Sequence, residues 1–153
     1  MFIYQPWPTQ YFEWSGLGLV FFVLFVAAFT DLKNRIIPNT LIFGGIMSLL
    51  FYILFFSTHS LPEHLWGFII GIFVFYSFFV LKIFGGGDSK LMMFVSLYFG
   101  ASFLFSVCLW VFMIGGLQAL FYRYFLHQKS VPYAVSITLG CLFYVLSSFL
   151  MTE

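Results

Sequence analysis

Long apolar runs separated by short polar breaks constrain this 153-residue chain more than any other feature. A helix needs about 20 apolar residues, within a range of about 17–25, to cross a hydrocarbon core about 30 Å thick. Runs close to this length occupy residues 15–30, 40–57, 64–81 and 133–151, and a longer run occupies residues 89–122. Because a bilayer offers no partners to unpaired backbone groups, each run is predicted to be helical. The sequence therefore predicts an all-α, polytopic membrane protein in contact with a lipid bilayer.

The longest run, residues 89–122, decides how many helices the bundle is expected to have. It is too long for one untilted span and short for two full spans. The small residues Gly100-Ala101-Ser102 offer a break that divides it into a short helix at 89–99 and a longer helix at 103–122. We therefore expect a bundle of six transmembrane helices.

The placement of the basic residues favours six helices over five. With six helices, all six Lys and Arg residues fall in the loops 31–39, 82–90 and 123–132. With five helices, Arg123 and Lys129 would lie on the opposite side from the others, and the asymmetry would weaken. The positive-inside rule makes the basic loops cytoplasmic and places both termini outside.

The composition excludes several classes of protein. The chain is 63% hydrophobic and 7% charged, whereas a soluble domain is about 25% charged. A disordered chain would need low hydrophobicity and high charge. The formal net charge is +1 and no basic stripe is present, so we expect no nucleic-acid partner. Because no long repeat or low-complexity linker is evident, residues 1–153 are predicted to form a single domain.

Two of the five acidic residues, Asp31 and Asp88, fall at the predicted cytoplasmic ends of helices. Asp31 directly follows an apolar run, where an anion faces the negative end of the helix macrodipole. Pairing with Lys33 or Arg35 is one interpretation of Asp31. Asp88 precedes a predicted helix, and capping that helix is one interpretation of this residue. Ionisable groups at the edge of a membrane bundle are costly, so their shared face favours a functional role.

The three glycines Gly85-Gly86-Gly87 stand directly before Asp88. Glycine adopts backbone conformations closed to other residues and allows a substrate chain to approach closely, although a flexible connector is the alternative interpretation. Two facing carboxylates in a low dielectric resist double ionisation and share one proton. The charged carboxylate then takes a proton from water while the protonated one polarises a carbonyl group. If Asp31 and Asp88 face each other, the predicted chemistry is that of an aspartic protease.

These motifs resemble those of a known family. Asp31 followed by Ile37-Pro38-Asn39, and then Gly85-Gly86-Gly87-Asp88-x-Lys90-Leu91, are similar to the motifs of the type IV prepilin peptidases. These are membrane-embedded aspartic peptidases of the G-x-G-D class. Pro132-Tyr133-Ala134-Val135 resembles the proline-tyrosine segment of the same family. The resemblance extends over nearly the whole chain.

The resemblance implies an activity and a partner. Such a peptidase removes a short basic leader from a prepilin or pseudopilin, at the cytoplasmic face of the bacterial inner membrane. In the substrate, an apolar helix follows the leader and a glycine. The resemblance assigns catalysis to Asp31 and Asp88. Its remaining motif and substrate-loop residues are Gly85, Gly87, Lys90, Pro38 and Asn39.

The chain also departs from the larger members of that family. Those members carry an N-terminal segment with paired C-x-x-C motifs and methylate the new N-terminus. Cys108 and Cys141 lie inside apolar runs and cannot replace such a segment. We therefore expect a compact form without a methyltransferase-type domain, similar to the peptidases of tight-adherence (Flp-type) pili. Because an aspartic dyad needs no metal and His59, His64 and His127 are scattered, we expect no metal and no cofactor.

Two other interpretations are compatible with the sequence. A small ion- or proton-coupled transporter could use the two aspartates as a relay. Transporters usually place such sites near the membrane midplane and often show internal repeats, whereas here both acids lie at one face. A catalytically idle assembly subunit of the same fold is the third interpretation. The oligomeric state and the choice of prepilin have no signal in the sequence.

Overall fold

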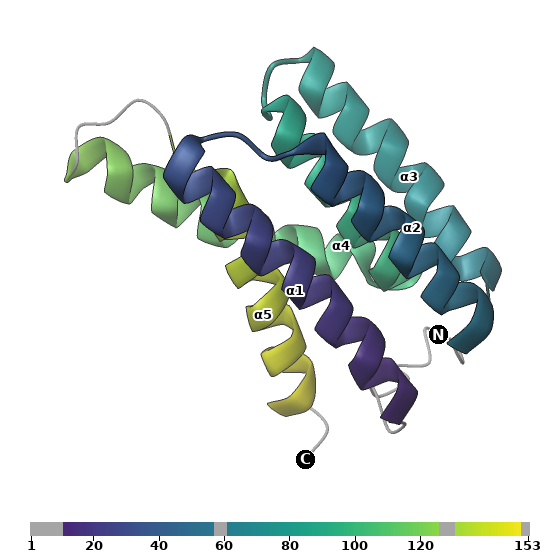
Figure 1. Cartoon of the computed structure of the whole chain (residues 1–153). Helices are drawn as coiled ribbons and strands as arrows, with labels where there is room; N and C mark the ends of the chain where they lie inside the picture. Colours follow the sequence, from purple (N-terminus) through teal and green to yellow (C-terminus); the bar gives the residue numbers. More distant parts are fainter. Residues whose placement is uncertain (1–10, 57–60, 126–130, 151–153) are drawn as a thin grey trace.

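The computed structural model describes residues 11–56, 61–125 and 131–150 of the chain, and these residues form helices without any strand. In chain order the helices are α1 (Tyr11–Asn34), α2 (Asn39–Phe56), α3 (Leu61–Val80), α4 (Gly86–Tyr124) and α5 (Tyr133–Leu150). The prediction of an all-α protein is confirmed. Figure 1 shows the helices packed as a bundle in which α4 passes behind α1 and α2.

The first half of α4 forms the centre of the bundle. Nearly every side chain from Leu91 to Gly100 is buried, because α1, α2, α3 and α5 all pack against α4. Small residues on α3 allow its close approach. A Cβ atom on Gly67 would overlap the backbone of Gly100, and one on Gly71 would overlap the side chain of Ser96. Packing of this kind holds helices together where hydrophobic burial gives no advantage over lipid.

The prediction of six separate helices is wrong, because the described residues form five. The run that was expected to split is a single 39-residue helix with one non-helical residue, Gly100, at φ 70° and ψ −179°. Glycine enters this region at little cost, so the chain changes direction at one residue without a loop. Figure 1 shows the two halves of α4 running in different directions. One turn before the kink, the His64 ring forms a 3.0 Å hydrogen bond with the Leu97 carbonyl oxygen through its Nδ1 atom.

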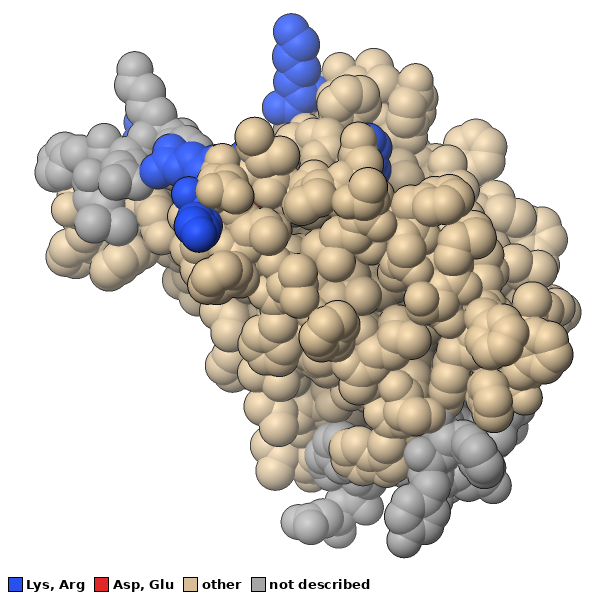
Figure 2. Space-filling view, viewed as in Figure 1, with Lys and Arg blue, Asp and Glu red and all other residues tan. Residues whose placement is uncertain are grey.

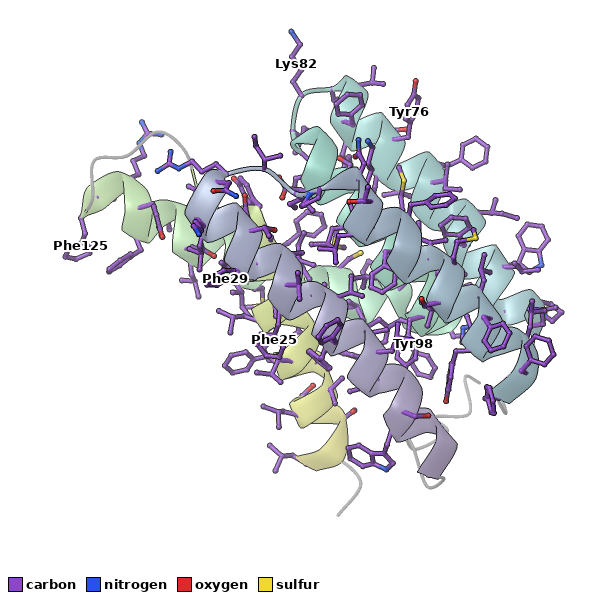
Figure 3. The ribbon with its side chains drawn as sticks, in the orientation of Figure 1. Phe25, Phe29, Tyr76, Lys82, Tyr98 and Phe125 are labelled. Atoms are coloured by element: carbon purple, nitrogen blue, oxygen red, sulfur yellow. The ribbon has the colours of Figure 1, made fainter. Side chains whose placement is uncertain are left out.

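The outer surface of the bundle is apolar. Among the described residues, four helices are long and apolar enough to cross a membrane, and Tyr133–Ser148 form a shorter apolar helix. Phe25 and Phe29 of α1 project outward with 57% and 66% of their surfaces exposed (Figure 3). Because such side chains are stable in lipid and not in water, the chain is a multi-pass membrane protein.

The basic side chains gather at one end of the bundle. The described members are Lys33, Arg35, Lys82, Lys90 and Arg123, whereas Lys129 lies outside the described residues. Figure 2 shows Lys and Arg along one edge of an otherwise uncharged face. The start of α1 and the end of α5 lie at the opposite end (Figure 1). We call the end of the bundle that carries the Lys and Arg residues the basic end.

Candidate active site

Asp31 belongs to the last turn of α1, which continues to Asn34, and does not follow the helix as the sequence suggested. The helix closes at Arg35, whose φ of 54° is left-handed and whose N–H donates to the Asp31 carbonyl at 2.8 Å. This is the geometry of a left-handed C-cap, a position that glycine usually holds. Pro38 follows and prevents the helix from resuming.

The carboxylate of Asp31 is held by another helix. It is 8% exposed, and its Oδ2 atom accepts a hydrogen bond from the backbone N–H of Ala134 at 3.2 Å. Ala134 is the second residue of α5, where backbone N–H groups lack helical partners and the macrodipole is positive. The positive end of α5 therefore offsets the unfavourable position of Asp31 at the negative end of α1. Arg35 adds an electrostatic interaction, in line with the pairing interpretation.

The loop before Asp88 begins at a second left-handed residue. At the end of α3, Lys82 has φ 57° and its N–H donates to the Phe79 carbonyl at 3.0 Å. The N–H of Ile83 donates to the Phe78 carbonyl at 2.9 Å. These two bonds form a Schellman motif, which ends α3 sharply and turns the chain back toward the bundle.

Asp88 is the third residue of α4 and not its N-cap, so the capping interpretation needs correction. The N-cap is Gly85, whose backbone is extended (φ −67°, ψ 155°). Gly85 itself makes no side-chain capping hydrogen bond. The Asp88 carboxylate instead folds back and accepts a hydrogen bond from the Gly85 backbone N–H. This is the returning half of a capping box, in which the third residue of a helix satisfies the N-cap amide.

Two of the glycines next to Asp88 leave little room for a side chain. A Cβ atom on Gly85 would lie 2.8 Å from Oδ2 of Asp88, where the carboxylate folds back. A Cβ atom on Gly87 would lie 3.2 Å from the Cβ atom of Ile37, in the loop that follows α1. Gly85 therefore makes room for the carboxylate, and Gly87 lets the two acidic loops approach each other. If the glycines formed only a flexible connector, Gly85 would not need to pack against Asp88, nor Gly87 against Ile37.

The fold brings the two aspartates together. The loop after Asp31 contacts the loop before Asp88 through Ile37 and Gly87. The two carboxylates are near enough to interact electrostatically, and Asp88 is only partly buried. Such a pair resists double ionisation and is suited to sharing one proton. The pair lies at the basic end of the bundle. Two carboxyl groups that share a proton are suited to activating a water molecule for attack on a carbonyl carbon.

The other motif residues lie beside the pair. Pro38 directly precedes α2, and its carbonyl accepts the Leu41 N–H at 3.2 Å. Lys90 donates from Nζ to Oδ1 of Asn39 at 2.8 Å, and both side chains are exposed. This bond ties the start of α2 to the second turn of α4. The structure therefore gathers all the motif residues at the basic end.

Sequence reasoning missed the polar contacts that hold α5 in place. Gln118, in the second half of α4, donates from Nε2 to the Pro132 carbonyl at 3.2 Å. The hydroxyl of Ser136 donates to Oε1 of the same glutamine. Both contacts lie within one turn of Ala134, the residue that binds Asp31. Gln118 is a lone amide in an apolar run, and this is the signal that could have identified it.

The other candidate ligands are dispersed. The described residues contain no group of three or more His, Cys, Asp or Glu residues that could hold a metal ion. His64 is buried against the Leu97 carbonyl, and His59 and His127 lie outside the described residues. Cys108 and Cys141 are unbridged thiols within apolar helices.

The fold and the site define a class: an all-helical membrane protein with a pair of interacting carboxylates at one end of its bundle. A model of the type IV leader peptidase family matches residues 18–120 of the chain, which include both aspartates. The chain therefore belongs to the type IV leader peptidase family, and its family reaction is peptide-bond hydrolysis. The match ends before α5 begins. No curated protein and no solved structure gives a significant match.

Proposed function

We propose that this protein is a membrane aspartic endopeptidase that removes the short basic leader from a type IV prepilin or pseudopilin of the Flp-like kind. In this proposal the basic end lies at the cytoplasmic face of the bacterial inner membrane. The observation that carries the proposal is the meeting of Asp31 and Asp88, from helices far apart in the chain, as an interacting pair. Membership of a peptidase family supports it independently.

In the proposed mechanism the two aspartates share one proton. The ionised carboxylate takes a proton from water, and the resulting hydroxide oxygen bonds to the carbonyl carbon of the scissile peptide. The protonated carboxyl donates a hydrogen bond to the carbonyl oxygen as negative charge develops on it. The carbon–nitrogen bond then breaks, and the proton passes to the leaving amine. The products are a leader with a free carboxylate and a pilin with a new amino terminus.

The activity is testable with a designed probe. The full probe carries a basic leader, one glycine and an apolar helix of about 20 residues, long enough to span a bilayer. Co-expression with the wild-type chain should shorten the probe by the mass of its leader, as measured by mass spectrometry of its N-terminus. An uncut probe, together with ion flux through the purified protein, would favour the transporter interpretation instead.

The proposed orientation has its own test. Cys108→Ser and Cys141→Ser first remove the native thiols. A cysteine replacing the exposed Lys82, at the basic end, should be shielded from an impermeant thiol reagent applied to intact cells. A cysteine replacing the exposed Leu61, at the start of α3, should react. The reverse labelling pattern would contradict the orientation.

A further inference from the structure

An apolar groove runs between α2 and α3 and ends beside the Asp88 loop. Its volume is about 650 Å³, and α4 forms its floor. Ile42 and Ile46 line it from α2, Ile72 and Phe79 from α3, and Met93 from α4. Its volume falls within the range of about 300–1,000 Å³ that is usual for ligand sites. We call it the α2–α3 groove.

One end of the α2–α3 groove is polar. Gly86, Ser89 and Lys90 line this end, and they flank Asp88 in the first turns of α4. Ser89 is 2% exposed, and its hydroxyl has no hydrogen-bond partner among the residues that the structure describes. A buried hydroxyl without a partner destabilises a fold, so its presence beside a groove points to a polar group supplied from outside.

We propose that the α2–α3 groove binds the apolar helical segment of the protein substrate that adjoins the scissile bond. This inference rests on the peptidase function proposed above, since the cut point must then reach Asp88. Side chains of the substrate helix fill the apolar length of the groove. At its polar end the substrate backbone passes Ser89, whose hydroxyl gains a carbonyl partner, and the scissile peptide emerges beside Asp88.

The chemistry of the groove fits a docked helix. A docked helix presents side chains at i, i+3, i+4 and i+7 to an apolar groove. In a bilayer, helices associate through close packing and hydrogen bonds, and the groove offers both. An acyl chain would also fill the apolar part, and its ester carbonyl would satisfy the Ser89 hydroxyl as a peptide carbonyl does, so the crosslinking measurement below separates a bound lipid from the substrate helix. Continuity with the Asp88 loop then places the end of the substrate helix at the carboxylate pair.

The test blocks the groove without touching the aspartates. Ile72→Trp fills the groove, and Phe73→Trp is the matched control, because Phe73 is 72% exposed and does not line it. Cleavage is measured with the full probe and with a short probe that ends a few polar residues after the glycine. Ile72→Trp should raise KM for the full probe about tenfold, as expected when one large apolar side chain loses its pocket, with the short probe unaffected. Equal loss on both probes, or no loss on either, would overturn the proposal.

A second measurement does not depend on cleavage. A photo-crosslinking phenylalanine derivative replaces Ile72 or, as control, Phe73, in a chain that also carries Asp88→Asn so that the full probe stays uncut. Crosslinks to the probe from position 72 but not from position 73 are expected. Crosslinks to lipid alone from both positions would overturn the proposal. If the wild-type chain leaves the probe uncut, the peptidase function fails, while the crosslinks still decide what the groove binds.

Discussion

Asp31 and Asp88 lie together at the basic end, yet the chain holds them in opposite ways. The carboxylate of Asp31 binds the N–H of Ala134, which is 103 residues further along the chain. The carboxylate of Asp88 binds the N–H of Gly85, in the same loop and helix turn. One position is therefore made by tertiary packing and the other by local backbone geometry.

This difference predicts which changes disturb each aspartate. The Asp88 position depends on the shape of the glycine loop, whereas the Asp31 position depends on how α5 docks against α1 and α4. Helix α5 lies outside the residues that match the peptidase family, yet its first turn completes the surroundings of Asp31. Substitutions in the two supports should therefore be separable.

The largest expected effect comes from the carboxylates themselves. Asn keeps the shape of Asp and an acceptor for the Ala134 or Gly85 N–H, so Asp31→Asn and Asp88→Asn should each accumulate in the membrane like the wild type. Neither amide accepts a proton from water or shares one with its partner, so each variant should lose at least about a thousandfold in cleavage of the full probe. The double variant should be no worse than either single variant, because the pair acts as one unit.

The control for these variants is Glu63→Gln, an acid at the opposite end of α3. It should cleave the probe normally. Cleavage near the wild-type rate by either Asn variant, at normal membrane levels, would remove the proposed mechanism and leave capping and ion pairing as the roles of the aspartates.

The next largest effect should follow from the local support of Asp88. In Gly85→Ala the new methyl group would lie 2.8 Å from Oδ2 of Asp88, so the carboxylate must move. A displacement of about 1 Å in a catalytic group costs about a hundredfold in rate. Gly44→Ala is the control, since its Cβ would meet nothing within 4 Å. Cleavage of the short probe and membrane levels should be compared, and an unchanged rate for Gly85→Ala would show that the folded-back carboxylate is not the active one.

The local half of the site could be predicted from the sequence, because its parts are neighbours in the chain. Three glycines before an acid at a helix start describe the Asp88 loop almost completely. The exact place of Asp88 inside α4 could not be predicted, since the shift from the N-cap to the third residue depends on whether the helix begins at Gly86. The sequence predicts a break at Gly100-Ala101-Ser102, and the structure has a kink at the first of these residues without a separation into two helices. A single left-handed glycine and a loop have the same small-residue pattern.

The tertiary half could not be predicted, for a physical reason. The sequence around Asp31 does not indicate that Ala134 is its partner. The donor is a backbone N–H, which every residue except proline carries, so the residue type gives no clue. The proline-tyrosine segment stands out in the sequence through the family resemblance, whereas Gln118 was missed, and the contact between them depends on the crossing of α4 and α5. The family resemblance pointed to the segment without giving its contact.

A smaller effect is expected from the support of Asp31. Gln118→Leu removes the partners of the Pro132 carbonyl and the Ser136 hydroxyl, which costs about 1–3 kcal/mol when such groups are left buried. The first turn of α5 should then be held less firmly against Asp31. We expect kcat for the short probe to fall about tenfold with little change in KM, since the loss concerns the transition state. Ser147→Ala, which removes a hydroxyl bonded only within α5 to Tyr144, is the matched control.

The double variant tests whether the supports of Asp31 and Asp88 act independently. If the two supports are independent, the losses of Gly85→Ala and Gln118→Leu should multiply in the double variant, as changes at separate sites usually do. A double variant no slower than Gly85→Ala alone would mean that both changes disturb the same carboxylate. A fall in membrane level without a change in kcat would reduce Gln118 to a packing residue.

The smallest effect should come from the bond between Lys90 and Asn39, which links the two acidic loops through exposed side chains. Exposed pairs involving one charge contribute about 0.2–1 kcal/mol, because water competes for both partners. Asn39→Ala should therefore slow cleavage of the short probe by less than about threefold, and Lys90→Met should behave similarly. A double-mutant cycle on the two positions measures their coupling directly, with thermal stability in detergent as a parallel readout. A coupling well above about 1 kcal/mol would show that the local and tertiary supports act through one shared link.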